Sequence, residues 1–208
     1  MFTGIITNTT EIKGSQSDVH GMRLKFKKPQ GWDDLRLGES VNTNGVCLTV
    51  AKIRPNDYEC FLMPETLKKT SFGVKVPKQA NLERALGAGD RFGGHFVQGH
   101  IDGIGTVSKI DKDDGWRIYV DFPKEFRELV IPKGSITING VSMTIAELDG
   151  ASLSVAVIPH TLEHTTLDSL AVGDAVNLEF DMIGKYTIGV MKIRDAEMEA
   201  YAANNQGR

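Results

Sequence analysis

Short runs in which apolar and polar residues alternate recur along the whole chain, a pattern typical of half-buried β-strands. Clusters of Gly, Pro, Asn and Asp, such as residues 54–57, separate the runs. Six or so short strands in about ninety residues predict a small antiparallel barrel in each half of the chain, because closure removes exposed strand edges. The runs span 22–26, 40–53, 59–63 and 80–86 in the first half, and 116–122, 135–148, 152–158 and 175–180 in the second.

The two halves also repeat each other in sequence. Residues 41–53 align without a gap with 136–148, and residues 63–70 align at the same offset with 158–165. Five of thirteen and four of eight positions are identical, where average composition would give roughly one or two over both windows. A period of this length suits a small domain and is too long for a solenoid unit. We therefore predict one duplicated domain, with copies at 1–88 and 89–184.

Helices are expected at three places. Pro64 and Pro159 each begin a segment that we predict to form a single helical turn, because proline suits the first helical position. Residues 185–208 belong to neither copy, and from about 185 to 203 they have a helical composition without proline. Such a helix could bury Val190, Ile193 and Tyr201 in an oligomer contact or fold back on its own barrel, and the sequence leaves both alternatives open.

Composition narrows the class of partner. The chain has 208 residues, 40% hydrophobic and 25% charged, and a net charge of -3, without the basic runs of a nucleic-acid binder. We expect a small molecule or another protein chain as partner. Cys47 and Cys60 form no CxxC pair, which favours a reducing cytoplasm. The first residues lack a signal-peptide pattern, and no stretch approaches the length of a membrane span.

The places where the two copies differ are candidates for chemistry. On a strand, Cys47 and Thr49 project to one face while Leu48 projects to the other, and Ser142 and Thr144 share a face in the second copy. The duplication thus predicts two similar pockets, one with a thiol and one with a hydroxyl. Taken alone, Cys47 is more simply read as a small buried hydrophobe, but its alignment with the polar Ser142 argues against that reading. Cys60 we interpret as structural.

A glycine-rich run at 93–105 opens the second copy and contains two histidines, His95 and His100. Their spacing of five puts them on opposite faces of a strand, so we predict no metal site. The run does not fit the pattern of a nucleotide-phosphate loop. Gly99 aligns with Gly4, and His100 with Ile5. We interpret Gly99 as backbone held close to a ligand and His100 as an acid-base group present in one copy only.

Four blocks of the sequence together resemble riboflavin synthase of the α-chain type. The blocks are residues 1–5, 44–50, 93–103 and 139–144, in the family's order and spacing across essentially the whole chain. The resemblance implies an all-β fold of two tandem six-stranded antiparallel Greek-key barrels plus a C-terminal α-helix that assembles a homotrimer. It further implies a reaction in which two molecules of 6,7-dimethyl-8-ribityllumazine exchange a four-carbon unit, giving riboflavin and 5-amino-6-ribitylaminouracil. No cofactor and no metal are expected, since electrons and carbons move between two identical molecules.

Residue roles follow from the same resemblance, position by position. Cys47, His100, Ser142 and Thr144 are expected to be catalytic, with Thr49 as the partner of Thr144 in the first barrel. Ser40 and Asp181 are weaker candidates. The other ring-contacting residues implied are Gly4, Ile5, Ile6, Leu48, Phe61, Leu62, Met63, Pro64, Glu65, Thr66, Gly99, Ile101, Lys133, Met143, Ala156, Val157, Ile158, Pro159, His160 and Thr161.

One motif departs from the family, and two other functions compete. The second copy reads Pro159-His160-Thr161 where Pro-Glu-Thr is frequent, which leaves the role of residue 160 open.

A non-catalytic lumazine- or flavin-binding protein of the same fold is the main alternative function. A flavin reductase domain is less suitable, because the chain lacks a nicotinamide-binding half. Association of the trimer with lumazine synthase is possible, and the sequence does not decide it.

Overall fold

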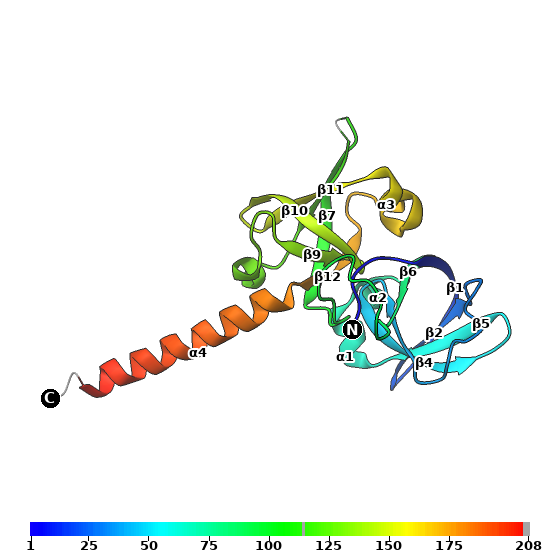
Figure 1. The fold of residues 1–208 in the computed structure, drawn as a ribbon, viewed down its shortest axis with the longest axis horizontal. Helices are drawn as coiled ribbons and strands as arrows, with labels where there is room; N and C mark the ends of the chain where they lie inside the picture. Colours follow the sequence, from blue (N-terminus) through cyan, green and yellow to red (C-terminus); the bar gives the residue numbers. More distant parts are fainter. Residues whose placement is uncertain (114, 206–208) are drawn as a thin grey trace.

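Two β-barrels and one long helix make up the computed structural model, which describes residues 1–113 and 115–205 (Figure 1). Each barrel is closed, antiparallel and six-stranded. The expected all-β fold with tandem barrels and a C-terminal helix is therefore confirmed. No described helix is both long enough and apolar enough to cross a membrane.

The barrels have the same strand order. The first runs β1-β2-β5-β4-β3-β6 around its wall, and the second has the same order, β7-β8-β11-β10-β9-β12. Strand β2 lies beside β5 and not beside β3, which makes the order a Greek key. The strands of the first barrel are β1 Asn8–Asp18, β2 Gly21–Lys27, β3 Ser40–Thr43, β4 Val46–Ile53, β5 Asp57–Leu62 and β6 Gln79–Arg84. Those of the second are β7 Gly103–Asp111, β8 Trp116–Asp121, β9 Ser135–Ile138, β10 Val141–Asp149, β11 Ser152–Val157 and β12 Ala175–Phe180.

Two of the predicted runs each contain two strands, and two strands lie outside the runs named from the sequence. The runs 40–53 and 135–148 are hairpins, because Asn44-Gly45 and Asn139-Gly140 all adopt positive φ, as the tight two-residue turn requires. Strand β1 lies outside those runs because polar residues dominate it, and β7 because two glycines and four polar residues interrupt its three apolar residues. Irregular pairing falls at matching places in the two copies, between Ile12 and Gly14 and between Val107 and Lys109.

The short helices follow the prolines. Pro64 and Pro159 occupy the first turns of α1 (Pro64–Lys69) and α3 (Pro159–His164), which confirms the predicted helical turns. Three further short segments are α2 (Ser71–Val74) and the 3-10 helices η1 (Lys124–Leu129) and η2 (Thr166–Ser169).

Helix α4 (Met182–Asn205) starts just before the predicted Lys185 and extends away from both barrels (Figure 1). At its base, the Lys185 ammonium bonds both Asp102 carboxylate oxygens, at 3.0 and 2.9 Å. Lys192 pairs with Glu128 of η1. The alternative of a helix folded back on its own barrel is therefore wrong. The tail at 206–208 lies outside the described residues.

Two buried asparagines join the barrels. The Asn81 side chain donates to the Asn139 carbonyl and accepts from the Thr166 N–H, at 2.9 and 2.7 Å. Asn177 makes the mirror pair: its side chain donates to the Asn44 carbonyl and accepts from the Ser71 N–H. Both side chains are fully buried, so each fastens one barrel to the hairpin turn of the other.

Candidate functional site

Strands β4 and β10 alternate as their sequences predict. Leu48 is 3% exposed within the first core, while Cys47 is half-buried and Thr49 exposed on the opposite face. In the second barrel Met143 is likewise in the core, with Ser142 half-buried and Thr144 exposed. Leu48 and Met143 therefore face away from any ligand on the outer face, and only their backbones could contact it.

The chain before β7 packs against the first barrel. The Cys47 N–H donates to the Gly99 carbonyl at 2.8 Å, which places the exposed His100 next to the thiol-bearing strand. A Cβ on Gly99 would lie 2.6 Å from the Cys47 Cβ. The close approach that requires glycine is thus to strand β4. That the Gly99 backbone also lies close to a ligand stays a prediction.

The N-terminal segment makes the mirror contact on the second barrel. The Ser142 N–H donates to the Gly4 carbonyl at 2.8 Å, and a Cβ on Gly4 would lie 2.7 Å from the Ser142 Cβ. Ile6 packs against the second core and Ile101 against the first. Each barrel therefore borrows one wall of its candidate pocket from the segment that precedes the other barrel.

Two buried glutamates hold these crossing segments, and sequence reasoning missed both. Glu83 accepts hydrogen bonds from the N–H groups of Thr3 and Gly4, at 2.7 and 2.9 Å. Glu179 accepts from the N–H groups of Gln98, Gly99 and His100. Burial raises the pKa of Glu179, against the lowering effect of those N–H donors. The available signal was the match between residues 81–83 and 177–179 in the two copies.

The remaining predicted residues follow β5 and β11 into the two short helices. Phe61 at the end of β5 and Thr66 in α1 are half-buried, while Met63 and Glu65 are exposed. In the second copy, Ala156 of β11 is exposed and Thr161 of α3 is half-buried. Leu62 and Val157 belong to the cores, like Leu48 and Met143. Pro64, Ile158, Pro159 and His160 are exposed, and the His160 ring stacks on His164 at a centroid distance of 4.2 Å.

Lys133 stands out for its backbone. Its φ is 66°, whereas the matching residue of the first copy, Gly38, has a φ of 82°. Both N–H groups donate to the neighbouring strand, to Ile145 and Val50 respectively. A lysine in this conformation carries strain that a glycine would avoid, and such strain is frequent at functional sites. The Lys133 side chain is exposed, and its contact with a ligand stays a prediction.

The two weaker candidates have ordinary surroundings. Ser40 lies directly across from Thr49 in the β3–β4 pair, so it borders the first candidate pocket. Asp181 accepts a hydrogen bond from the Ile183 N–H at the start of α4, which gives its carboxylate a structural role.

A histidine not predicted as a site residue contacts Ser142. His95 Nδ1 lies 2.8 Å from Ser142 Oγ, while its Nε2 is buried and hydrogen-bonds to no described residue. Burial lowers the pKa of His95, and the negative charge of Asp181 opposes this shift. In the second candidate pocket, the Ser142 hydroxyl is thus hydrogen-bonded to the His95 imidazole.

Comparison with known proteins identifies the family. The Lumazine binding domain matches the chain twice, at residues 3–85 and 98–181. Riboflavin synthase of Bacillus amyloliquefaciens is 43% identical over 189 residues, which cover 89% of this chain and 87% of the relative. That of Mycobacterium tuberculosis is 38% identical over 92% of this chain and 98% of the relative. The chain belongs to the riboflavin synthase family.

Solved structures agree with this assignment. LumP complexed with 6,7-dimethyl-8-(1'-D-ribityl) lumazine superimposes with a TM-score of 0.78 at 26% identity, over 86% of this chain and 99% of LumP. LumP complexed with riboflavin gives a TM-score of 0.79. In the riboflavin synthase fold seen here, each lumazine-binding domain match covers one barrel together with its crossing segment.

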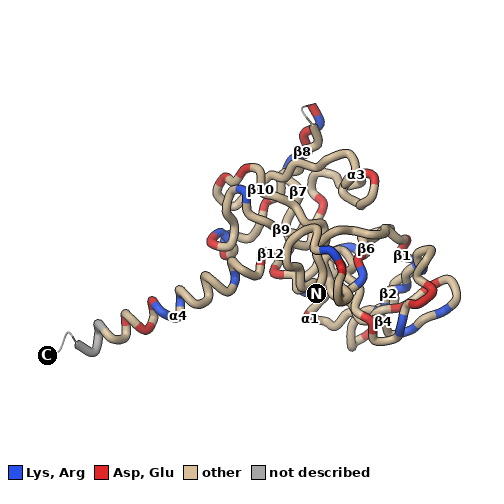
Figure 2. The backbone as a smooth tube through the Cα atoms, in the orientation of Figure 1, with Lys and Arg blue, Asp and Glu red and all other residues tan. Residues whose placement is uncertain are grey.

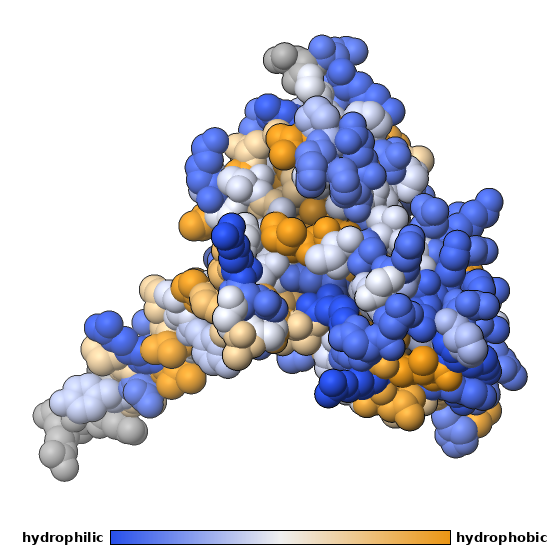
Figure 3. All heavy atoms as spheres, turned by 45° about the vertical axis from the view of Figure 1, so that its right-hand side comes forward, coloured by the Kyte–Doolittle hydropathy of each residue, from blue (hydrophilic) through white to orange (hydrophobic). Residues whose placement is uncertain are grey.

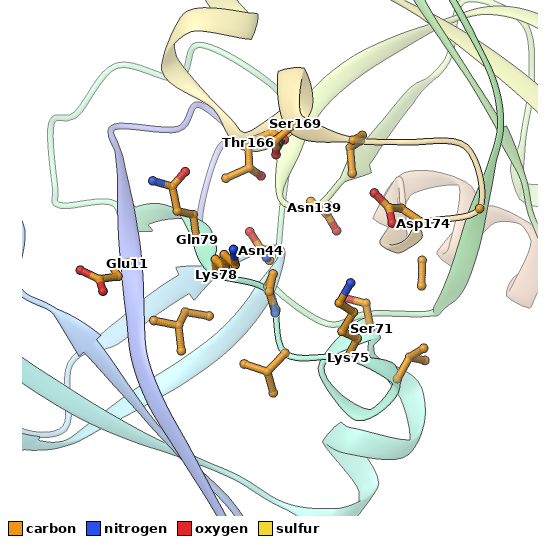
Figure 4. Close-up of a pocket in the computed structure, with 17 residues that line it drawn as sticks. Glu11, Asn44, Ser71, Lys75, Lys78, Gln79, Asn139, Thr166, Ser169 and Asp174 are labelled. Carbon is orange, nitrogen blue, oxygen red and sulfur yellow. Dashed lines mark hydrogen bonds between the residues drawn. The ribbon is translucent and has the colours of Figure 1, made fainter.

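A groove of about 980 Å³ lies elsewhere on the molecule (Figure 4). None of the predicted site residues lines it. Asn44, Ser71, Asn139 and Thr166 line its wall and take part in the asparagine bonds between the barrels, so we interpret the groove as the open side of that seam.

Acidic and basic residues are interspersed over the barrels and α4 (Figure 2). Among residues 1–113 and 115–205, no three His, Cys, Asp or Glu side chains are grouped so as to hold a metal.

Proposed function

We propose that this chain is a riboflavin synthase, which converts two molecules of 6,7-dimethyl-8-ribityllumazine into riboflavin and 5-amino-6-ribitylaminouracil. The observation that carries the proposal is the pair of lumazine-binding barrels with small polar residues at the same outer position, Cys47 and Ser142. Two such pockets provide one place for each substrate molecule. Holding two rings in a defined orientation removes much of the entropic barrier of a bimolecular step.

The reaction needs proton transfers at defined places. One lumazine loses a proton from its acidic 7-methyl group, a nucleophile adds to the other ring, and the product is then eliminated. We assign the acid-base work to His100, which is exposed beside Cys47 and held through its N–H by Glu179. Cys47, Ser142, Thr144 and Thr49 supply hydrogen-bonding groups along the two outward strand faces.

Incubation of the purified chain with the lumazine tests this proposal. We expect one riboflavin for every two lumazines consumed, followed by absorbance and chromatography. Activity should survive exhaustive chelation and need no added nucleotide, because the assigned groups are acids, bases and hydrogen-bond donors. A requirement for a metal or NAD(P)H would contradict the proposal.

A non-catalytic lumazine-binding protein is the second candidate. It is supported by the likeness to LumP, whose structures hold lumazine, riboflavin or flavin mononucleotide. The same incubation separates the two functions. Binding that quenches or shifts lumazine fluorescence, with no riboflavin formed, would favour the binding protein.

We also propose that α4 assembles a homotrimer in which pockets of neighbouring subunits face each other. Its apolar side chains Ile183, Val190, Met191, Ile193 and Met198 are all more than half exposed, and Figure 3 shows apolar patches on the projecting arm. An isolated helix that exposes so much apolar surface is a typical oligomer contact.

Removal of the helix tests the assembly. A chain that ends after Tyr186 keeps the Lys185–Asp102 pair, so we expect folded barrels that still bind lumazine, sediment as monomers and have lost most catalysis. Val190→Lys should act similarly, whereas Glu199→Lys lies on the opposite side of α4 and serves as its control. A fully active monomer would contradict the proposal. A cytoplasmic location and association with lumazine synthase stay predictions.

A further inference from the structure

The contact between Ser142 and His95 has no part in the function proposed above. Ser142 Oγ lies 2.8 Å from His95 Nδ1, on the outward face of β10 that also carries Thr144. This is a full hydrogen bond to the group that we expect at the second lumazine. No other hydrogen bond of the Ser142 hydroxyl is formed with the described residues.

His95 is held firmly in this position. Its N–H donates to the Thr3 carbonyl at 3.1 Å, next to the antiparallel bridge between Phe2 and Val97. Thr3 is itself fixed, because both its N–H and its hydroxyl donate to Glu83 at 2.7 Å. The residue as a whole is 9% exposed. A side chain packed and anchored to this degree can fix the direction of a neighbouring hydroxyl.

The protonation of the ring decides which way the hydrogen bond runs. Burial lowers the pKa of His95 from its usual value near 6.5, so the ring is neutral at pH 7, with a proton on one nitrogen only. Nε2 is buried without a described partner. A buried N–H without an acceptor is rarer in proteins than an acceptor without a donor. This favours the tautomer in which Nδ1–H donates to Ser142 Oγ and Nε2 carries no proton.

In that arrangement the Ser142 oxygen accepts from His95, and its own proton is free to point outward. We infer that His95 is a positioning residue that makes Ser142 a directed hydrogen-bond donor to the carbonyl oxygens or bare nitrogens of the heterocycle in the second pocket. The inference rests on the proposed function for the identity of the ligand. The first barrel differs here, since no described residue hydrogen-bonds the Cys47 thiol.

A double-mutant cycle tests whether His95 acts through Ser142. We expect His95→Leu to lower kcat about three- to ten-fold, as for the loss of one hydrogen bond, with a smaller change in KM. In a Ser142→Ala background the same change should have no further effect. His95→Asn places an amide nitrogen near the position of Nδ1 and should restore most of the activity. Equal effects of His95→Leu in both backgrounds, or no rescue by Asn, would overturn the inference.

Two further measurements keep the test decisive if His95→Leu folds poorly or the wild type forms no riboflavin. NMR of the full chain labelled with ¹⁵N-histidine should show a protonated Nδ1 and a bare Nε2 for His95; the opposite tautomer would contradict the donor role. The cycle can also be measured on lumazine affinity by fluorescence titration. A wild type without turnover would disprove the proposed function, while the coupling in affinity would still decide the role of His95.

Discussion

The two candidate pockets have the same backbone frame but different side chains. In both, a half-buried strand residue donates its N–H to a glycine carbonyl at 2.8 Å, Cys47 to Gly99 and Ser142 to Gly4. In both, a glutamate holds the crossing segment. The thiol of Cys47, however, has no hydrogen-bond partner among the described residues, whereas Ser142 has His95.

The difference indicates where the two copies of the duplicated fold have diverged. Because the segments cross, the exposed residue beside Cys47 is His100 from the second copy, and the one beside Ser142 is Ile5 from the first. The first pocket therefore has an exposed imidazole and the second an apolar side chain. Lys133 stands where the first barrel has Gly38, so only the second barrel has a cation at this position. The shared backbone contacts stabilise both pockets, and the side chains that differ give each pocket its own chemistry.

The largest effect should come from breaking the frame that both pockets share. Asn81→Leu leaves the Asn139 carbonyl and the Thr166 N–H buried without partners. Each unpaired buried group costs about 1–3 kcal/mol, so we expect a loss of about 2–6 kcal/mol of unfolding free energy in urea titrations. Asn177→Leu should cost a similar amount, and Asn56→Leu, at an exposed position, should cost little. A large difference between Asn81→Leu and Asn177→Leu would mean that the two fastenings are not equivalent.

Next in size is the loss of the acid-base group found in one copy only. His100→Gln should lower turnover roughly hundred-fold or more, while lumazine affinity stays within a few fold, because the side chain is exposed and only its N–H is held by Glu179. Steady-state kinetics and fluorescence titration measure the two quantities. His20→Gln, the same change in an exposed turn, is the control. Unchanged turnover would remove His100 from the mechanism.

A smaller effect is expected where the crossing segment touches the first barrel. Gly99→Ala combines a φ of 79° with a Cβ placed 2.7 Å from the Cys47 backbone nitrogen. The conformation alone costs about 1–2 kcal/mol, and the clash adds to it. Gly89→Ala isolates the first cost, since its φ is 95° and nothing lies within 4 Å. If both variants lost the same stability, the close approach to Cys47 would be unimportant.

The outcome of the sequence predictions follows from the range of the interactions involved. Alternation correctly placed Cys47 with Thr49, and Ser142 with Thr144, on one strand face, because strand geometry is local. The crossing of the segments could not be predicted, since the bonds of Gly4 and Gly99 reach far along the chain. His95 was missed for the same reason: its contact with Ser142 depends on the tertiary fold. The asparagine and glutamate pairs were visible as repeated residues, but their burial was not.

The pH dependence of stability should reveal a further difference between the two barrels. In the first, a hydrogen bond from Arg54 lowers the pKa of the buried Glu59; the matching residue of the second is Ser154, which has no charge. A carboxyl with a lowered folded pKa stabilises fully above its unfolded pKa of about 4.3, and the contribution is lost as pH falls through the folded pKa. Wild type should therefore lose more stability on acidification from pH 7 than Glu59→Gln does. Glu65→Gln removes an exposed carboxyl whose pKa Lys69 lowers, so it should change the pH dependence little.

The smallest effect is expected where the first pocket is made to resemble the second. Cys47→Ser replaces the thiol with the group found at residue 142, and a hydroxyl can still hydrogen-bond to the ring or to a bound water. We expect it to retain part of the turnover and Cys47→Ala to retain less. Thiol labelling supplies a check on the same chain: Cys47 is half-buried and should react, whereas Cys60 is buried and its pKa is raised to about 12. Near-wild-type turnover in both variants would show that neither thiol nor hydroxyl is needed, and that the asymmetry between the pockets depends on His100 and His95 instead.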